Sequence, residues 1–230
     1  MRLSKYRPSA PLCILPAGSL EWHSFHNPLG TDSLKAHAIC CEAALKHGGV
    51  VLPPIYQGLV GMDNWGPKDW DGYTLGYNQD EVFKQTVIGL CTALVKSGWK
   101  MIVAVTGHDV DEQKRAMQEA IDIAIENTDA KGFSIFEGEL HIPDDIIPLS
   151  MDHAAAWETS CMMYSYPEKV DLSQLENKDM SDIWDYNKHL PDKPTGMTGE
   201  NPLTKASAEI GKLIVEKMGD LIGSKAIKAL

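Results

Sequence analysis

The sequence predicts an α/β fold in which helices cover both faces of a parallel sheet. Short apolar runs typical of strands alternate along the chain with longer segments of helical periodicity. This alternation favours right-handed crossovers, which lay successive strands parallel in one sheet. With 230 residues, 43% hydrophobic and 23% charged, the chain can bury a sizeable core, so we expect one domain over residues 1–230.

Four short runs are the candidate strands of this sheet. They cover residues 11–15, 50–53, 101–105 and 133–136. The first helix is expected after the first of these runs, with Asp32 or Ser33 as its N-cap. It should end near residue 47, because the two glycines that follow stop a helix.

Four further helices are expected in the remaining sequence. Asn78 or Asp80 can cap the second, and the third covers about 111–127. Apolar residues in the third fall at spacings of three and four, so one stripe must face a sheet. A fourth helix should start near Ala154 and a fifth should cover about 203–222.

Two long segments do not fit the alternation. Residues 56–79 are rich in Gly, Trp and Asp, and residues 170–201 are polar with scattered aromatics and prolines. Loops of this length in a compact domain usually serve as lids or binding surfaces. We therefore expect both near a ligand site.

Charge and cysteine content exclude several classes of partner. The 21 Lys and Arg against 32 Asp and Glu give a net charge of −11, which repels phosphate backbones and anionic membranes. No apolar run approaches the roughly 20 residues of a membrane span, and the start of the chain lacks a secretory apolar stretch. Five cysteines without CxxC spacing indicate reduced core thiols. We expect a cytoplasmic protein with a small-molecule substrate, no nucleic acid and no membrane.

Metal-ligating residue types follow the first and third predicted strands. Glu21, His23 and Asp32 come after the first, and His108 follows the third. Ligands of open parallel sheets bind beyond the carboxyl ends of the strands, so these residues should meet. Carboxylates and imidazoles together suit Zn²⁺ or Mn²⁺ and occur in two-metal hydrolytic sites. The sequence thus predicts a binuclear metal site, although each residue alone could have a structural role, with Asp32 simply a helix cap.

Other histidines carry a weaker signal. His26 follows the Glu-x-His pair by three residues and could support a metal ligand from behind. For His37 and His47, a position within a helix or near its end is sufficient explanation.

Five sequence blocks resemble the creatininase (creatinine amidohydrolase) family. LPAGSLEWHSFHNPLGTD at 15–32 resembles its first signature, and VLPPIYQG at 51–58 resembles the next. TGH at 106–108, DHAAAWETS at 152–160 and GMTGENPLTKASAEIG at 196–211 resemble the later blocks, in the same order. The resemblance therefore spans nearly the whole chain.

The resemblance implies a three-layer α/β/α sandwich around a mostly parallel sheet, often assembled as a homohexamer. It also implies a binuclear metal hydrolase with two divalent ions, Zn²⁺ or Mn²⁺, with iron as an alternative. By resemblance Glu21 and His108 hold one metal, His23 holds the other, and Asp32 bridges the two. A metal-bridging water of lowered pKa would then be the nucleophile.

The sequence also departs from creatininase at informative positions. Creatininase has a glutamate two residues after the histidine of the third block, where this chain has Val110. Glu158 could supply the missing carboxylate, with Asp109 as the second choice. Leu149 stands where creatininase has a tryptophan that packs on creatinine. Creatinine is therefore not the expected substrate.

We expect an amidohydrolase-type enzyme that acts on a small polar, cyclic amide or related carbonyl compound. His153 is the candidate general acid/base that passes a proton to the leaving group, with a hydrogen bond to backbone as its structural alternative. The expected substrate-binding residues are Asp109, Trp65, Trp70, Tyr73 and Trp157.

Two other functions stay open. The family resemblance also admits cleavage of a carbon–carbon bond in a cyclic diketone, as in some relatives in inositol breakdown. Alternatively, the chain is a catalytically inert protein that kept the fold and serves in binding or assembly, which Val110 and Asp109 would support. Metal content distinguishes the inert protein from the enzyme.

Overall fold

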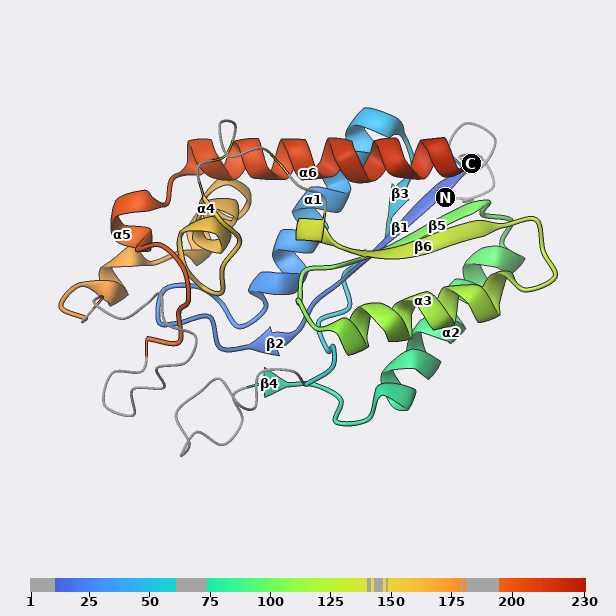
Figure 1. Ribbon diagram of the computed structural model, residues 1–230, viewed down its shortest axis with the longest axis horizontal. Helices are drawn as coiled ribbons and strands as arrows, with labels where there is room; N and C mark the ends of the chain where they lie inside the picture. The colour runs from blue at the N-terminus through green and yellow to red at the C-terminus, as the bar shows by residue number, and fades with distance from the viewer. Residues whose placement is uncertain are drawn as a thin grey trace.

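The computed structural model describes residues 11–60, 74–139, 142, 147, 149–178, 180 and 195–230. At its centre lies a four-stranded parallel sheet (Figure 1) with the strand order β3-β1-β5-β6. The strands are β1 (Leu12–Ala17), β3 (Val50–Val51), β5 (Met101–Thr106) and β6 (Lys131–Phe136). Each predicted strand run overlaps one of them, so the predicted α/β fold with a parallel sheet is confirmed.

Helices cover both faces of this sheet (Figure 1). On one face pack α1 (Thr31–His47), α4 (Ala156–Ser165) and α6 (Ala208–Ala229). On the other pack α2 (Asp80–Lys96) and α3 (Asp111–Ile125). The result is the three-layer arrangement that the resemblance implied.

Side-chain alternation along β1 explains why its sequence is apolar at every position. Leu12 and Ile14 belong to the core under α1, α4 and α6, whereas Leu15 and Ala17 belong to the core under α2 and α3. Successive side chains of a strand point to opposite faces, and both faces of this sheet are covered. A strand between two helical layers therefore has no solvent-facing position for a polar residue.

Short elements lie around these layers. β2 (Leu20–Glu21) pairs antiparallel with β4 (Thr74–Leu75) in a separate small sheet. The others are η2 (Glu137–Glu139), η3 (Pro167–Lys169), η4 (Leu172–Leu175) and α5 (Pro202–Lys205). β4 lies within the predicted loop 56–79. η3 ends just before the predicted loop 170–201, whose first residue, Val170, is its C-cap. Residues 61–73 and 181–194 of the two predicted loops lie outside the described part.

The predicted N-caps of the first two helices are wrong. α1 begins at Thr31, with Gly30 as N-cap and no side-chain cap, so Asp32 and Ser33 lie in its first turn. The hydroxyl of Ser33 donates to the carbonyl of Ile55 instead, at 3.0 Å. Neither Asn78 nor Asp80 caps α2, whose N-cap is Gln79. Gly48 ends α1 as predicted, at a φ of 77° that favours glycine.

The last helices also differ from the prediction. α4 begins at Ala156 rather than near Ala154, because Ala154 has a φ of 56° and cannot belong to a right-handed helix. The predicted fifth helix is two helices, α5 and α6. Ser207 separates them, since its hydroxyl accepts the N–H of Ile210 at 3.2 Å and starts α6 anew. None of the described helices is long and apolar enough to cross a membrane.

Candidate metal centre

Two glycines admit the start of α1 between the carboxyl ends of β1 and β5. Gly18 follows β1, and a Cβ there would lie 2.3 Å from the backbone nitrogen of Ser33. Gly107 follows β5, and a Cβ there would lie 2.2 Å from the backbone oxygen of Asp32. Because only glycine lacks this atom, the two positions let Asp32 reach the crevice beyond the strand ends.

The carboxylate of Asp32 faces two histidines at once. Its Oδ1 lies 3.1 Å from Nε2 of His23, and its Oδ2 lies 3.3 Å from Nδ1 of His108. All three side chains are buried. One carboxylate thus joins two groups of possible metal ligands, one around each histidine.

The first group consists of Glu21, Asp32 and His108. Oε1 of Glu21 lies 3.3 Å from Nδ1 of His108. The second group consists of His23, Asp32 and Glu158, with Oε2 of Glu158 3.3 Å from Nε2 of His23. Within each group the ligand atoms lie within 4.8 Å of one another, close enough to coordinate a common ion.

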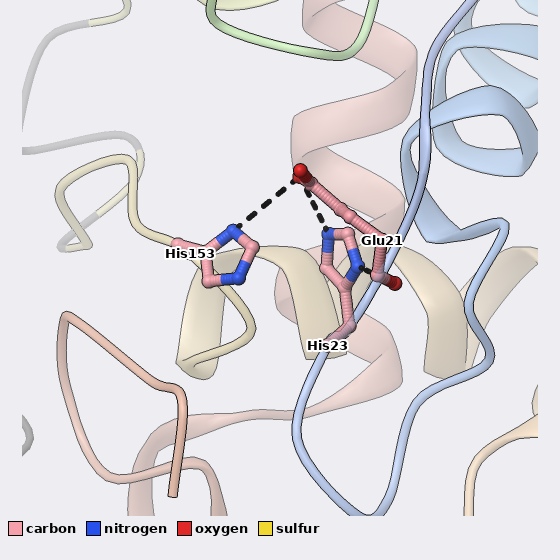
Figure 2. A group of neighbouring side chains, drawn as sticks. All are labelled: Glu21, His23 and His153. Atoms are coloured by element: carbon pink, nitrogen blue, oxygen red, sulfur yellow. Dashed lines mark hydrogen bonds and ion pairs between the residues drawn. The ribbon is translucent and has the colours of Figure 1, made fainter. Parts of the chain in front are cut away.

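His153 lies beside His23, and both rings point at the same carboxylate oxygen of Glu21 (Figure 2). Oε1 of Glu21 is 3.8 Å from Nδ1 of His153 and 3.9 Å from Nε2 of His23. The two imidazole rings lie with their centroids 4.6 Å apart. Backbone hydrogen bonds between His153 and Thr198, both 2.9 Å long, fix the segment just ahead of α4. Glu21, His23 and His153 thereby form a third possible ligand group.

Each of the three histidines is oriented by a backbone carbonyl. Nδ1 of His23 lies 3.1 Å from the carbonyl of Glu21, Nε2 of His108 lies 3.1 Å from that of Leu59, and Nε2 of His153 lies 3.0 Å from that of Trp22. A carbonyl only accepts, so these nitrogens donate. The opposite nitrogen of each ring faces the carboxylates and is free to bind a metal, the usual arrangement around metal-ligating histidines.

The carboxylates strongly perturb the two central histidines. Burial opposes the protonation of His108, but Glu21 and Asp32 outweigh it and raise the pKa of His108 to about 10. Burial likewise opposes protonation of His23, whose pKa Glu158 and Asp32 hold well above its ordinary value. Without a cation, the buried negative charge is therefore balanced by protons on the imidazoles.

The residues present fit divalent metal ions. Oε2 of Glu21 is buried and accepts no hydrogen bond from any residue that the structure describes. Buried polar atoms left without a partner are costly, and a cation would supply the partner. The donor set of carboxylate oxygens and imidazole nitrogens is that of zinc or manganese rather than of calcium or magnesium.

Glu158 is held by neighbours on both of its oxygens. Oε2 accepts the N–H of Ala154 at 2.6 Å, and Oε1 accepts a hydrogen bond from the ammonium of Lys35. Asp152 caps the start of α4, since it accepts the N–H of Trp157 at 2.6 Å and that of Glu158 at 3.2 Å. These contacts direct Glu158 towards His23.

A cavity of about 310 Å³ opens beside the ligand groups. Its polar wall contains most of these ligands together with Lys35, Glu137, Asp152 and His153. Val110, Phe136, Met151 and Trp157 supply an apolar wall. The cavity is of a size for a small polar molecule.

The structure brings together all five predicted metal ligands and His153. Two of the residues predicted to bind substrate, Trp157 and Asp109, line the cavity. Asp109 is exposed and belongs to none of the ligand groups among the described residues. His26 belongs to none of the ligand groups among the described residues, and its Nε2 lies 2.7 Å from the hydroxyl of Thr159. The predictions for the aromatic residues between 61 and 73 lie outside the described residues; they concern Trp65, Trp70 and Tyr73.

Two residues of the site were missed by the sequence reasoning, Lys35 and Glu137. Glu137 directly follows β6, so the rule that directs attention to residues after strands would have found it. Lys35 lies three residues after Asp32 on α1, on the same side of the helix. A lysine on the buried side of a helix that already carries a candidate ligand was the available signal.

Fold and site together define an α/β protein with a candidate metal centre at the carboxyl edge of its sheet. The sequence model of the Creatininase family, described as creatinine amidohydrolase, matches residues 1–225. This chain therefore belongs to the creatininase family, whose members are metal-dependent hydrolases of the amidohydrolase type.

Individual relatives agree with this assignment. The creatinine amidohydrolase of Pseudomonas putida is 25% identical over 229 residues, which cover 88% of this chain and 84% of that protein. A mutant creatininase of the Zn-Zn type has a similar fold, with a TM-score of 0.78 at 23% identity over 99% of this chain and 95% of that one. A manganese creatininase gives a TM-score of 0.76 at 22% identity, covering 99% and 96%.

Proposed function

We propose that this protein is a binuclear metal-dependent hydrolase that uses a metal-activated water to cleave a small polar, cyclic amide or related carbonyl compound. One observation carries the proposal: the two oxygens of Asp32 face different histidines, 3.1 Å from His23 and 3.3 Å from His108. Glu21 completes the group at His108, and Glu158 completes the group at His23. A bridging carboxylate between two ligand sets is the arrangement of two-metal hydrolytic sites.

The cofactors in this proposal are two divalent ions, zinc or manganese. The buried carboxylate and imidazole donors support this choice, as do the zinc and manganese forms of structurally similar creatininases. When bound, such a pair of ions polarises a carbonyl and lowers the pKa of a water molecule.

His153 is the proposed general acid/base. It lines the cavity, and its Nδ1 lies 3.8 Å from Glu21, while its Nε2 donates to the carbonyl of Trp22. Burial, followed by the charge of His23, lowers the pKa of His153 below its ordinary value. At neutral pH the imidazole is therefore neutral, and Nδ1 can take up a proton and pass it to a leaving group.

The lining of the cavity supports a substrate other than creatinine. Leu149 stands where creatininase has its creatinine-packing tryptophan, and here this leucine is buried in the hydrophobic core. The described apolar wall comes instead from Trp157, Phe136 and Met151. A pocket whose aromatic wall differs from that of creatininase should select a ring other than that of creatinine.

Metal analysis of two variants tests the ligand assignment. The wild-type protein should hold about two metals per chain, and Glu158→Gln should lose the one beside His23, because the amide lacks the charge that a dication requires. Asp109→Asn is the matched control and should keep both. Absence of metal in the supplemented wild type would instead identify an inert family member. Loss of a metal in Asp109→Asn but not in Glu158→Gln would make Asp109 the ligand.

Activity assays test the chemistry. Turnover should be found in a panel of cyclic amides, and His153→Gln should lower kcat by about 10²- to 10⁴-fold while both metals remain bound. Cyclic diketones belong in the same panel. Turnover of diketones alone would show that the broken bond is carbon–carbon and would overturn the amide assignment.

We also propose a cytoplasmic homo-oligomer, with the hexamer as first choice. The family resemblance supports the assembly, and the five unpaired cysteines support a reducing compartment. Light scattering of the purified protein at micromolar concentration should give the mass of an oligomer, and a monomer would contradict the proposal.

A further inference from the structure

A buried lysine lies beside the candidate metal centre and has no part in the function proposed above. Lys35 is on α1, one turn after Asp32, and is only 2% exposed. Its ammonium contacts Oε1 of Glu158 and lies 2.7 Å from Oε1 of Glu137. Burying an ammonium is costly unless it is paired, so this placement needs a reason.

Because Lys35 contacts one oxygen of Glu158, the two oxygens of this carboxylate have different partners. Oε1 is occupied by the ammonium. Oε2 accepts the N–H of Ala154 at 2.6 Å and lies 3.3 Å from Nε2 of His23. With one oxygen held on each side, the carboxylate cannot turn to present both oxygens to a metal or swing away from His23. Only Oε2 is available as a ligand.

Glu137 holds the lysine in this position. It begins η2 directly after β6, is 2% exposed, and contacts the same ammonium of Lys35 as Glu158 does. A flexible lysine side chain gains a fixed place from two charged partners more readily than from one. The chain Glu137–Lys35–Glu158 therefore connects the end of β6, the first turns of α1 and the start of α4 next to the candidate centre.

We propose that Lys35 is a positioning residue that fixes Glu158 as a one-oxygen ligand of the second metal, with Glu137 as the anchor of the lysine. The inference rests on the proposed binuclear function and adds the residue on which the second ligand set depends. Removal of a residue that orients a metal ligand typically lowers metal affinity by about 10- to 100-fold.

Two variants separate positioning from simple charge balance. Lys35→Met removes the ammonium but leaves two carboxylates, Glu137 and Glu158, facing each other in a buried space, so it should also lower thermal stability. The double variant Lys35→Met/Glu137→Met removes that repulsion. If Lys35 only balanced the charge of the carboxylates, the double variant would bind the second metal at least as tightly as the wild type, because the positive ammonium would no longer repel the metal ion.

Chelator competition on the full-length protein gives the decisive measurement. We expect the affinity for the second zinc ion to fall about 10- to 100-fold in both variants, while the first zinc ion, held by Glu21 and His108, is unaffected. The double variant should regain thermal stability without regaining that affinity. Lys84→Met is the matched control, because Lys84 also contacts two glutamates, at 2.8 and 3.0 Å, but lies on α2. It should leave both affinities unchanged.

Cobalt substitution adds a readout that a folding defect alone would not produce. The visible absorption of the second Co²⁺ should change in Lys35→Met and stay unchanged in Lys84→Met, because the band reports the ligands around the ion. Wild-type affinity for the second metal in the double variant would overturn the role of Lys35 and leave the binuclear hydrolase intact. Fewer than two metals in the wild type would overturn both proposals.

Discussion

Gly107→Ala tests whether the position of Asp32 depends on the absence of a side chain at the end of β5. A Cβ on Gly107 would lie 2.2 Å from the backbone oxygen and 2.9 Å from the carbonyl carbon of Asp32. Real Cβ atoms essentially never come within 3.0 Å of a heavy atom outside their own residue and its two chain neighbours. The first turn of α1 must therefore move by about 1 Å, since backbone cannot rotate away as a flexible side chain does.

The displacement should cost both stability and metal binding. Overpacking of this kind costs about 1–3 kcal/mol, which for a chain of this size lowers Tm by about 2–12 °C. Metal–ligand distances tolerate only about 0.2 Å of change. Because Asp32 belongs to both ligand groups, we expect both metals to bind more weakly, in contrast to Glu158→Gln, which affects one.

Calorimetry of the metal-free protein and chelator competition measure the two effects. Gly89→Ala is the matched control, since a Cβ on this exposed residue of α2 meets nothing within 4 Å. It should stabilise the protein by up to about 1 kcal/mol through helix propensity and leave the metals untouched. Unchanged Tm and wild-type affinity for both metals in Gly107→Ala would refute the idea that the glycine places Asp32.

Three further predictions concern the pH dependence of metal binding, the reactivity of one cysteine and the packing of two helices. Carboxylates outweigh burial and raise the pKa values of His23 and His108, the latter to about 10. Metal binding at pH 8 should therefore release about two protons, and the metal affinity should increase as pH rises towards 10. Calorimetry in buffers of different ionisation heat measures the proton release, and finding none would contradict this prediction. Cys41 is the one half-buried cysteine of the five, so iodoacetamide should modify it first in the native protein, as peptide mass mapping can check. Gly211→Ala should lower Tm, because its Cβ would lie 1.8 Å from the backbone oxygen of Ser160 where α6 crosses α4, and an unchanged Tm would show that this crossing relaxes freely.

The layout of strands and the first set of candidate ligands could be predicted from the sequence. β1 and β5 are recognisable because a strand covered on both faces must be apolar throughout, as Leu12–Ala17 and Met101–Thr106 are. Glu21, His23 and His108 follow these strands closely, and a parallel sheet gathers strand ends at one edge. For these residues, local pattern and fold class suffice to predict proximity.

Helix starts were predicted less well. Asp32 has the side chain of an N-cap, yet it faces two histidines, because the close approach permitted by Gly18 and Gly107 carries it into the crevice. Ser33 likewise bonds to the carbonyl of Ile55 on a distant segment. Capping preferences are local, and both side chains found stronger partners in the tertiary structure.

The sequence by itself determined the α/β class and the histidines and carboxylates that can bind metal, because both depend on residue type and on spacing along the chain. It left two candidates for a missing carboxylate, Glu158 first and Asp109 second, since both lie near motif histidines. Tertiary structure alone decided that Glu158 lies 3.3 Å from His23, and that its other oxygen meets a lysine 123 residues away in the chain. That choice depends on how α1, α4 and the end of β6 pack together, and packing between distant segments leaves no periodic signal in the sequence.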